Sequence, residues 1–343
     1  MDIKQRFIDA TGSSFFLTAG QESELSQYLK AHSWMDANEI ITNTEKPGEG
    51  NMNFVLRVQT NRRSFIIKQA RPWVEKYPQL AAPIERIQTE SQFYSLVQQN
   101  ELLKTYTPSL VGTDVANYVL VLEDLGDGAD FSYVYQKGED FTGAELDSLV
   151  TFLQSLHHTV LASDAKDSFP KNQALKELNH EHIFDFPYRS DNGMDLDGIQ
   201  PGLRSLAEPI YADDSLRQKI SQLGELYLGE GNHLIHGDFY PGSWLKVNGT
   251  VKVIDPEFSY FGLAEFDVAV FLAHLKMAQS SPALQQKVRE QYQAPSDFDE
   301  TLLDQFIGVE ILRRLIGIAQ LPLALTIDEK GQLMQEAISL LKQ

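Results

Sequence analysis

The sequence contains no cysteine among its 343 residues. This absence excludes disulfide bonds, thiolate metal sites and cysteine nucleophiles. Long apolar runs are also missing, since no stretch approaches the roughly 20 apolar residues that a membrane span needs. The segment from Met1 to Gly20 has one brief apolar run, Phe15–Leu17, with acids in front of it, unlike a signal peptide. We therefore expect a cytoplasmic protein with no membrane partner.

Positive charge is scarce relative to negative charge. The chain has 29 Lys and Arg against 48 Asp and Glu, which gives a formal net charge of −19. Such a chain lacks the clustered cations that neutralise nucleic-acid phosphates, so we expect no nucleic-acid partner. A hydrophobic content of 42% excludes a mainly disordered protein, and the length allows two domains or one large domain with lobes.

Two acidic motifs, His236–Ser243 and Asp255–Glu257, are the most informative part of the sequence. Between them, Trp244–Val247 and Val251–Ile254 read as strands joined at Asn248–Gly249, a strong hairpin signal. The hairpin would bring the acids of the two motifs to the same end of a ribbon. Gly, Pro and Asp are ordinary turn residues, so either motif alone is weak, but the ordered pair around a hairpin indicates function.

Three acids in this arrangement suit metal-assisted phosphoryl transfer to a hydroxyl. The reaction needs a base that orients the acceptor and a metal ion that neutralises the phosphates. Asp238 can be the catalytic base, and Asp255 with Glu257 can hold Mg²⁺, which prefers carboxylate oxygens. Ser243 has the spacing from Asp238 at which protein kinases place a metal-binding Asn. A hydroxyl is a weaker ligand than an amide, so whether Ser243 binds metal is left open.

The N-terminal part reads as a helix followed by a β-rich region. Residues 21–32 have helical spacing, and residues 53–58 and 64–69 read as a hairpin. A turn rich in Gly and Asn precedes this hairpin, and its backbone amides could approach phosphates. The residues of this turn that we assign to nucleotide binding are Gly48, Gly50, Asn51 and Asn53.

Lys68 shares a strand face with Ile66, so its ammonium could point into a cleft, although a lysine on an edge strand would lie at the surface. A kinase lysine needs an acidic partner on a nearby helix. In the segment 84–99, Glu90 falls on the apolar face, whereas Glu85 falls elsewhere. Because an inward carboxylate is costly unless it is paired, we expect Glu90 to pair with Lys68.

Tyr118–Leu125 reads as a buried strand that runs into Gly126–Gly128, a natural hinge. The backbone of Glu123 and Leu125 could receive a purine ring, and backbone contacts would not distinguish ATP from GTP. Helical periodicity dominates afterwards, at residues 142–161, 215–228, 265–277 and 298–319.

The order of elements predicts a bilobal α+β fold. A small β-rich nucleotide-binding lobe, residues 1–125, precedes a larger, mainly helical catalytic and substrate lobe, residues 126–343. The stretch 172–205 is acidic and irregular, and we interpret it as an insertion or a loop on the substrate side. It lacks the ligand order of a calcium loop.

With these residues in place, the chain resembles the choline/aminoglycoside phosphotransferase superfamily, and within it the methylthioribose kinase branch. The resemblance implies a protein-kinase-like fold for the two lobes. The segments that carry the resemblance are Gly48–Asn53, Ile66–Ala70, His236–Asp238 with Gly242–Ser243, Asp255–Phe258, Gly262, Phe266–Val268 and Arg313–Gly317. Phe239–Pro241 departs from the Leu-His-Thr that is usual in the branch, which leaves the acceptor open.

The resemblance implies an ATP-dependent kinase that uses Mg²⁺ and phosphorylates a hydroxyl of a small molecule, with a methylthioribose-like sugar as the best single guess. It implies that Lys68 contacts the nucleotide phosphates, Glu90 orients Lys68 and Asp238 is the base. It also implies that Asp255 and Glu257 bind Mg²⁺. Finally, it implies that Arg313 and Arg314 reach the acceptor.

The two arginines lie in an apolar run, Val309–Ile318. As neighbours on a helix they are not expected to face the same way, and a buried one must find an acid or a ligand. An equally good alternative is that neither arginine binds a ligand. One would then form a structural salt bridge, and the other would extend its charged end to the surface.

Two other functions remain open. An aminoglycoside, choline or fructosamine-type kinase would use a cationic acceptor, and a catalytically silent kinase-like protein would bind nucleotide without turnover. A panel of acceptors separates these readings. The sequence also leaves the oligomeric state open, with a homodimer as one option.

Overall fold

A computed structural model describes residues 2–48, 52–160 and 165–343, and the chain divides into two compact units. Unit 1 comprises Met1–Gly128 together with Lys252–Phe258, and unit 2 comprises Ala129–Val251 together with Ser259–Gln343. The segment 252–258, which the sequence reading assigned to the C-terminal lobe, thus groups with the N-terminal unit. Within the described ranges, no helix combines the length and the apolar character needed to cross a bilayer.

Unit 1 is built on a five-stranded antiparallel sheet with the strand order β1-β2-β3-β7-β6. The strands are β1 (Ile41–Glu45), β2 (Phe54–Thr60), β3 (Ser64–Gln69), β6 (Leu110–Asp114) and β7 (Val119–Glu123). The expected hairpin is confirmed, since β2 pairs with β3 from Phe54–Gln69 to Gln59–Ser64. Its smaller elements are α1 (Ile3–Thr11), α2 (Glu22–Ala31), β4 (Trp73–Val74), β5 (Tyr77–Ala81), α3 (Arg86–Val97), η1 (Leu103–Thr105) and η6 (Pro256–Phe258).

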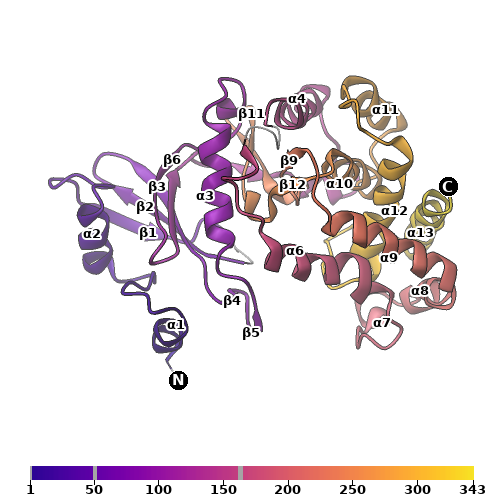
Figure 1. Ribbon diagram of the computed structural model, residues 1–343, viewed down its shortest axis with the longest axis horizontal. Helices are drawn as coiled ribbons and strands as arrows, with labels where there is room; N and C mark the ends of the chain where they lie inside the picture. Colours follow the sequence, from indigo (N-terminus) through magenta and orange to yellow (C-terminus); the bar gives the residue numbers. More distant parts are fainter. Residues whose placement is uncertain (1, 49–51, 161–164) are drawn as a thin grey trace. The chain divides into compact units, whose positions relative to one another are not determined.

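The two faces of this sheet carry different residues because side chains alternate along a strand. On β3, Phe65 and Ile67 face a hydrophobic core that also contains Leu25 and Leu29 of α2. Lys68 follows Ile67 and therefore points to the opposite face. Helix α3, beside the sheet in Figure 1, carries the acid that this lysine contacts. The sheet thus separates an apolar core from a face that holds charge.

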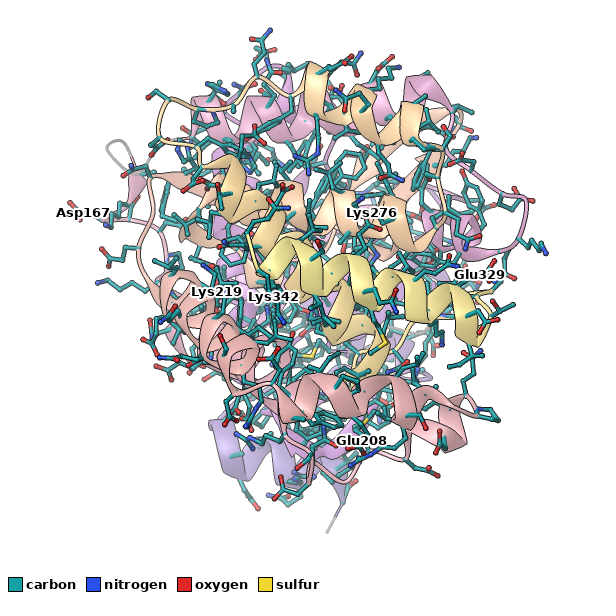
Figure 2. All side chains as sticks on the ribbon, turned by 90° about the vertical axis from the view of Figure 1, so that its right-hand side faces the viewer. Asp167, Glu208, Lys219, Lys276, Glu329 and Lys342 are labelled. Atoms are coloured by element: carbon teal, nitrogen blue, oxygen red, sulfur yellow. The ribbon has the colours of Figure 1, made fainter. Side chains whose placement is uncertain are left out.

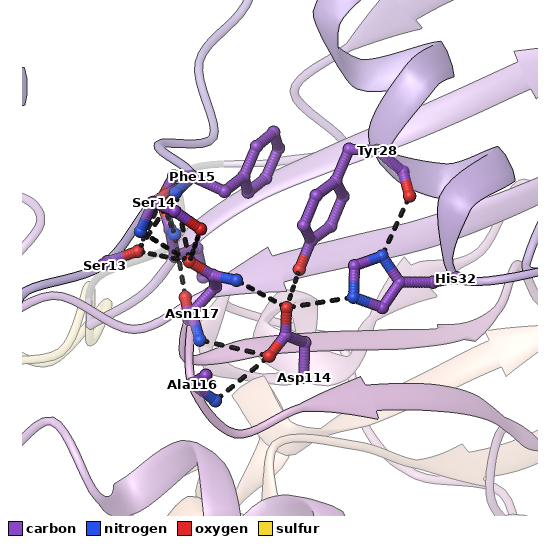
Figure 3. Close-up of polar contacts among 9 residues, drawn as sticks. Ser13, Ser14, Phe15, Tyr28, His32, Asp114, Ala116 and Asn117 are labelled. Carbon is purple, nitrogen blue, oxygen red and sulfur yellow. Dashed lines mark hydrogen bonds and ion pairs between the residues drawn. The ribbon is translucent and has the colours of Figure 1, made fainter.

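A polar network ties the N-terminal segment of unit 1 to the turn between β6 and β7 (Figure 3). Asn117 Oδ1 accepts from Ser13 Oγ at 2.7 Å and from the Phe15 amide at 3.0 Å. Asn117 Nδ2 donates to Asp114 Oδ2 at 2.6 Å, and the Tyr28 hydroxyl donates to the same oxygen at 2.7 Å. The network anchors the segment that leads from α1 to α2.

Unit 2 is mainly helical, as expected. Its helices are α4 (Gly143–Thr159), α6 (Gln173–His180), α7 (Leu196–Ile199), α8 (Leu203–Ala212), α9 (Asp214–Leu228), α10 (Ala264–Met277), α11 (Pro282–Gln291), α12 (Glu300–Ile316) and α13 (Ile327–Leu341). Short turns of helix are η2 (Phe131–Tyr135), η3 (Glu181–Asp185), η4 (Phe186–Tyr188) and η5 (Pro241–Ser243).

The core of unit 2 is centred on α10 and α12. Every residue of α10 except Lys276 is buried, as is typical of a helix that is apolar on all sides. Helix α12 packs against both α10 and α13. In Figure 2, α13 runs between the labelled Glu329 and Lys342, and Lys342 Nζ lies 2.8 Å from Asp213 Oδ2.

The few strands of unit 2 position the acidic loop. They are β8 (Ala129–Asp130), β9 (His233–Ile235), β10 (Trp244–Val247) and β12 (Tyr260–Gly262), while β11 (Thr250–Val253) crosses the unit boundary. Asn248 and Gly249, between β10 and β11, have φ values of 48° and 79°. These left-handed conformations are those of a tight hairpin turn, so the predicted hairpin is confirmed.

The interpretation of residues 172–205 as irregular is wrong for much of the stretch. It contains α6, η3, η4, α7 and the first turn of α8. These segments are short, and α6 has eight residues with Leu175 as its deeply buried apolar anchor. Such a segment gives little helical periodicity to read.

Candidate active site

Lys68 and Glu90 form a buried ion pair in unit 1. Lys68 Nζ lies 2.7 Å from Glu90 Oε1, and the residues are 6% and 0% exposed. Lys68 also contacts the carboxylate of Asp255. Burial favours a lower pKa for Lys68, but the charges of Asp255 and Glu90 outweigh it and raise the pKa above the ordinary value. Lys68 is therefore a permanent cation, and the expected pairing with Glu90 is present.

Arg86, on the same helix as Glu90, joins three segments of unit 1. It is fully buried, and its Nε donates to Asn53 Oδ1 at 2.9 Å and lies 3.4 Å from Glu257 Oε2. Its Nη2 donates to the Met52 carbonyl at 2.8 Å. Asn53 Nδ2 in turn donates to Glu257 Oε2 at 3.0 Å. Arg86 thus links Met52 and Asn53 to the Asp255–Glu257 motif.

The two acids of this motif differ in environment. Burial raises the pKa of Glu257 to about 8, with Arg86 opposing the shift and the acids around it adding to it. A carboxyl group in this state gains from a nearby divalent cation, which stabilises its ionised form. Asp255 is half-exposed and has a left-handed backbone, with φ of 61°. The donor set of these two carboxylates fits Mg²⁺ completed by phosphate oxygens and water.

No group of three or more His, Cys, Asp or Glu side chains forms a metal centre in the parts of the chain that the structure describes. A site with two carboxylates needs the nucleotide to complete it, as the sequence reading assumed.

The other residues assigned to nucleotide binding lie in unit 1 or outside the described residues. Gly48 is exposed, whereas Gly50 and Asn51 lie outside the described residues. Glu123 is the last residue of β7, and its amide donates to the Ser109 carbonyl at 2.8 Å. Leu125, two positions after Glu123, is partly buried. These positions remain predictions as nucleotide contacts.

In unit 2, Asp238 lies on a loop that is held through its backbone. Asp267, in the first turn of α10, accepts from the amides of His236 and Gly237 at 2.6 and 2.9 Å. Gly237 has φ of 81°, a conformation that glycine adopts without strain. Ser243 donates from its hydroxyl to the carbonyl of Asp238 at 3.0 Å. Asp267 therefore braces the loop that carries Asp238.

Arg313 and Arg314 both face Asp238, so the expectation that these neighbours point different ways is wrong. Arg314 Nη2 lies 3.1 Å and Arg313 Nη2 lies 3.6 Å from Asp238 Oδ1. The reason is Glu310, which precedes them by three and four positions on α12. Residues at these two spacings flank Glu310 on the same helix face, and both Nε groups bind its carboxylate.

Glu310 is the residue that the sequence reading missed in unit 2. It is 1% exposed, and although its burial favours protonation, the charges of Arg313 and Arg314 lower its pKa below the ordinary value. The four charges of this cluster, two acids and two arginines, balance. The sequence did contain a signal for this cluster, because an acid three and four residues before two arginines lies on the same helix face as both. For Arg86, the corresponding signal was its position four residues before Glu90.

The chain belongs to the phosphotransferase enzyme family (APH), whose sequence pattern matches residues 48–303. Methylthioribose kinases are among its relatives. The kinase of Bacillus cereus (strain G9842) is 28% identical over 264 residues, which are 73% of this chain and 64% of that protein. The methylthioribose kinase of Exiguobacterium sibiricum is 28% identical over 252 residues, which are 70% of this chain and 62% of that protein. The matched region spans less than two thirds of either relative.

Solved structures agree on the fold. An ethanolamine kinase of Plasmodium vivax has a TM-score of 0.57 at 15% identity, and the match covers 98% of this chain and 92% of that one. A spectinomycin phosphotransferase, in complex with ADP and spectinomycin, has a TM-score of 0.54 at 12% identity. The match covers 95% of this chain and 98% of that one. The predicted α+β, kinase-like fold class and the predicted superfamily are confirmed.

Proposed function

We propose that this chain is an ATP-dependent kinase that transfers the γ-phosphoryl group to a hydroxyl of a small sugar resembling methylthioribose. The observation that carries this proposal is the buried Lys68–Glu90 ion pair, whose lysine also contacts Asp255. Phosphoryl-transfer enzymes of the kinase type use such a lysine to hold nucleotide phosphates beside a metal-binding aspartate. Membership of the phosphotransferase family and the methylthioribose kinase relatives support the same reaction.

In this mechanism, Lys68 would hold the phosphates, with Glu90 fixing the direction of its ammonium. The turn with Gly48, Gly50, Asn51 and Asn53 would cover the phosphates, and the backbone of Glu123 and Leu125 would receive the purine. Asp255 and Glu257, with Ser243 as a further candidate, would hold Mg²⁺. When bound, Mg²⁺ would neutralise charge on the phosphates.

Asp238 would accept the proton of the attacking hydroxyl. Its side chain is 23% exposed, so an acceptor can reach it. Arg313 and Arg314 would orient the acceptor through their terminal nitrogens. Their five-donor guanidinium groups suit a molecule that carries several oxygen atoms.

The charges near Asp238 favour a neutral acceptor over the cationic acceptors of the alternative reading. Asp238 and Glu310 are already paired with the two arginines. The ring of Tyr240, which could otherwise receive a quaternary ammonium group, lies 4.8 Å from the guanidinium carbon of Arg314. An aminoglycoside or choline would therefore meet two cations beside the base. ATP as the donor, a cytoplasmic location and a homodimer remain predictions of the sequence.

The test is phosphate transfer from ATP or GTP, with Mg²⁺, to a panel of methylthioribose, ribose, choline and an aminoglycoside. We expect transfer to methylthioribose with ATP, and its loss in Asp238→Ala. Transfer to an amine-bearing acceptor instead would establish the cationic alternative. Nucleotide binding without any transfer, and unchanged in Asp238→Ala, would establish the silent kinase-like protein.

A further inference from the structure

A hydrogen-bonded chain of Tyr135, His274 and Glu310 lies buried behind the arginine pair. The Tyr135 hydroxyl lies 2.5 Å from His274 Nδ1, and His274 Nε2 lies 3.0 Å from Glu310 Oε1. The three residues are 3%, 0% and 1% exposed. They come from η2, α10 and α12, so the chain joins three separate elements of unit 2.

The direction of the hydrogen bonds follows from the protonation states. Burial lowers the pKa of His274 to about 4, so its ring is neutral at physiological pH. The carboxylate of Glu310 only accepts hydrogen bonds, so the single ring proton is on Nε2. Nδ1 is then an acceptor, and the Tyr135 hydroxyl donates to it. Each residue fixes the orientation of the next, and the last is the carboxylate that holds both arginines.

Glu310 determines which nitrogens of the arginines remain for other partners. It binds the Nε of Arg313 and the Nε of Arg314, the latter at 2.8 Å. The terminal nitrogens are thereby directed to Asp238. Rotation of the Glu310 carboxylate would shift both guanidinium groups together. His274 opposes that rotation because it donates to the same oxygen, Oε1, as Arg314.

Tyr240 adds an aromatic contact to the cluster. Its ring centroid lies 5.4 Å from that of His274 and 4.8 Å from the guanidinium carbon of Arg314. Tyr240 belongs to the tripeptide that departs from the methylthioribose kinase pattern. The sequence difference thus lies at the arginine cluster, where it can affect the acceptor.

We propose that Tyr135, His274 and Glu310 are positioning residues that fix how Arg313 and Arg314 present their terminal nitrogens to the acceptor. This inference rests on the proposed function for its kinetic consequence. The chain would set acceptor affinity, and it would have little effect on nucleotide affinity, since all its members belong to unit 2, whereas Lys68 and Glu90 belong to unit 1.

Unit 2 contains a second chain of a tyrosine, a histidine and an acid, which provides a comparison. The Tyr292 hydroxyl lies 2.7 Å from His157 Nδ1, and His157 Nε2 lies 3.3 Å from Asp267 Oδ2. This chain ends on the backbone amides before Asp238, whereas the first ends on the arginines. Tyr135→Phe and Tyr292→Phe each remove one buried hydroxyl bonded to a histidine, so they carry the same structural cost.

The experiment compares these two variants in ATP affinity, in kcat and KM for methylthioribose, and in phenylglyoxal labelling of Arg313 and Arg314 followed by mass spectrometry. We expect Tyr135→Phe to raise the acceptor KM about 2- to 10-fold, the effect of one hydrogen bond, and to change the labelling rate of both arginines. Tyr292→Phe should instead lower kcat and leave both the acceptor KM and the labelling rate unchanged. Melting temperature and ATP affinity report whether each variant is folded.

If the two variants had equal effects on the acceptor KM and on the labelling rate, the proposed positioning role would be wrong. It would also be wrong if the arginines of Tyr135→Phe were labelled at the same rate as those of the wild type. His274→Phe, which removes both hydrogen bonds of the ring, should change the labelling more than Tyr135→Phe. Labelling does not need turnover. A wild-type protein that phosphorylates no acceptor would therefore overturn the proposed function, while the labelling rates would still decide the positioning role.

Discussion

Arg86 Nε and Glu257 Oε2 lie 3.4 Å apart, and the two side chains are 0% and 8% exposed. Arg86 also donates to Asn53 and to the carbonyl of Met52. One guanidinium group therefore holds Asn53, which we assign to nucleotide binding, and a carboxylate that we assign to Mg²⁺. A helix residue with no predicted role connects two parts of the candidate nucleotide site.

We predict that Arg86→Met lowers the free energy of unfolding by about 3–5 kcal/mol, because it removes the buried cation beside Glu257 and leaves several buried carbonyl groups without the donor that they have in Arg86. Urea unfolding followed by fluorescence measures this loss. Arg62→Met is the control, since Arg62 pairs with Asp36 at 2.7 Å but the two side chains are 51% and 69% exposed. The control should lose at most about 1 kcal/mol. Equal losses would show that Arg86 has no bridging role.

A second prediction concerns the ion pair of Lys68 and Glu90. Lys68→Met leaves a buried carboxylate with no adjacent ammonium and should cost about 3–5 kcal/mol of stability. Combined with Glu90→Leu, the double variant should lose less than the sum of the single losses. A double-mutant cycle of unfolding free energies measures this coupling. Additive losses would argue against the pair, whereas loss of ATP binding in Lys68→Met would support its proposed role.

Asp267→Asn tests the brace of the catalytic loop. An amide has one acceptor oxygen and an NH₂ group, so it cannot accept from the amides of both His236 and Gly237. One buried donor left unpaired costs about 1–3 kcal/mol, and we expect kcat to fall about 10- to 100-fold with ATP affinity unchanged. Asp299→Asn is the control, because both amides that bind Asp299, at the exposed start of α12, donate to the single oxygen Oδ1, which Asn retains, so this variant should lose neither hydrogen bond. A kcat equal to that of the wild type in Asp267→Asn would contradict the brace.

The buried His274 predicts a dependence of stability on pH. Its folded pKa of about 4 is below the ordinary value of 6.5, so the unfolded chain binds the proton first. Stability is therefore complete above pH 6.5 and falls as the pH decreases toward 4. The loss amounts to about 3 kcal/mol for a shift of this size.

Unfolding in urea at a series of pH values between 7 and 4 measures this loss. His274→Gln has no titrating ring at this position, so its stability should fall less steeply over the same range. The buried His157, whose pKa is also lowered by burial, remains in the variant and contributes a residual slope. Identical slopes in the two proteins would contradict the assignment of a neutral His274.

The Lys68–Glu90 pair could be predicted from the sequence because both residues lie in regular elements. The period of two residues along β3 and of 3.6 residues along α3 shows which face of its element each side chain lies on. A charged side chain on the inward face has few possible partners. The prediction needed only the two periodicities and the cost of an unpaired charge. The β2–β3 hairpin was equally accessible because its two strands are adjacent in sequence.

The buried clusters were not accessible in the same way. Tyr135 and His274 are 139 positions apart, and no local pattern relates them. Glu310 and its arginines are close in sequence, but in an apolar run they looked like isolated charges. Both arginines reach the carboxylate of Glu310 because their side chains are long and because they flank it at three and four positions. The simple rule that neighbouring residues on a helix face different ways does not include this possibility.

The return of residues 252–258 to unit 1 has a consequence for synthesis on the ribosome. Residues 1–128 are translated before residues 129–251, and Asp255 and Glu257 come only after both. The N-terminal part of unit 1 therefore lacks these acids while residues 129–251 are being made. During that interval, Lys68 and Arg86 lack one of their carboxylate partners. Unit 1 therefore cannot reach its final structure until residue 258 has been translated, which means that residues 129–251 of unit 2 are made before unit 1 is complete.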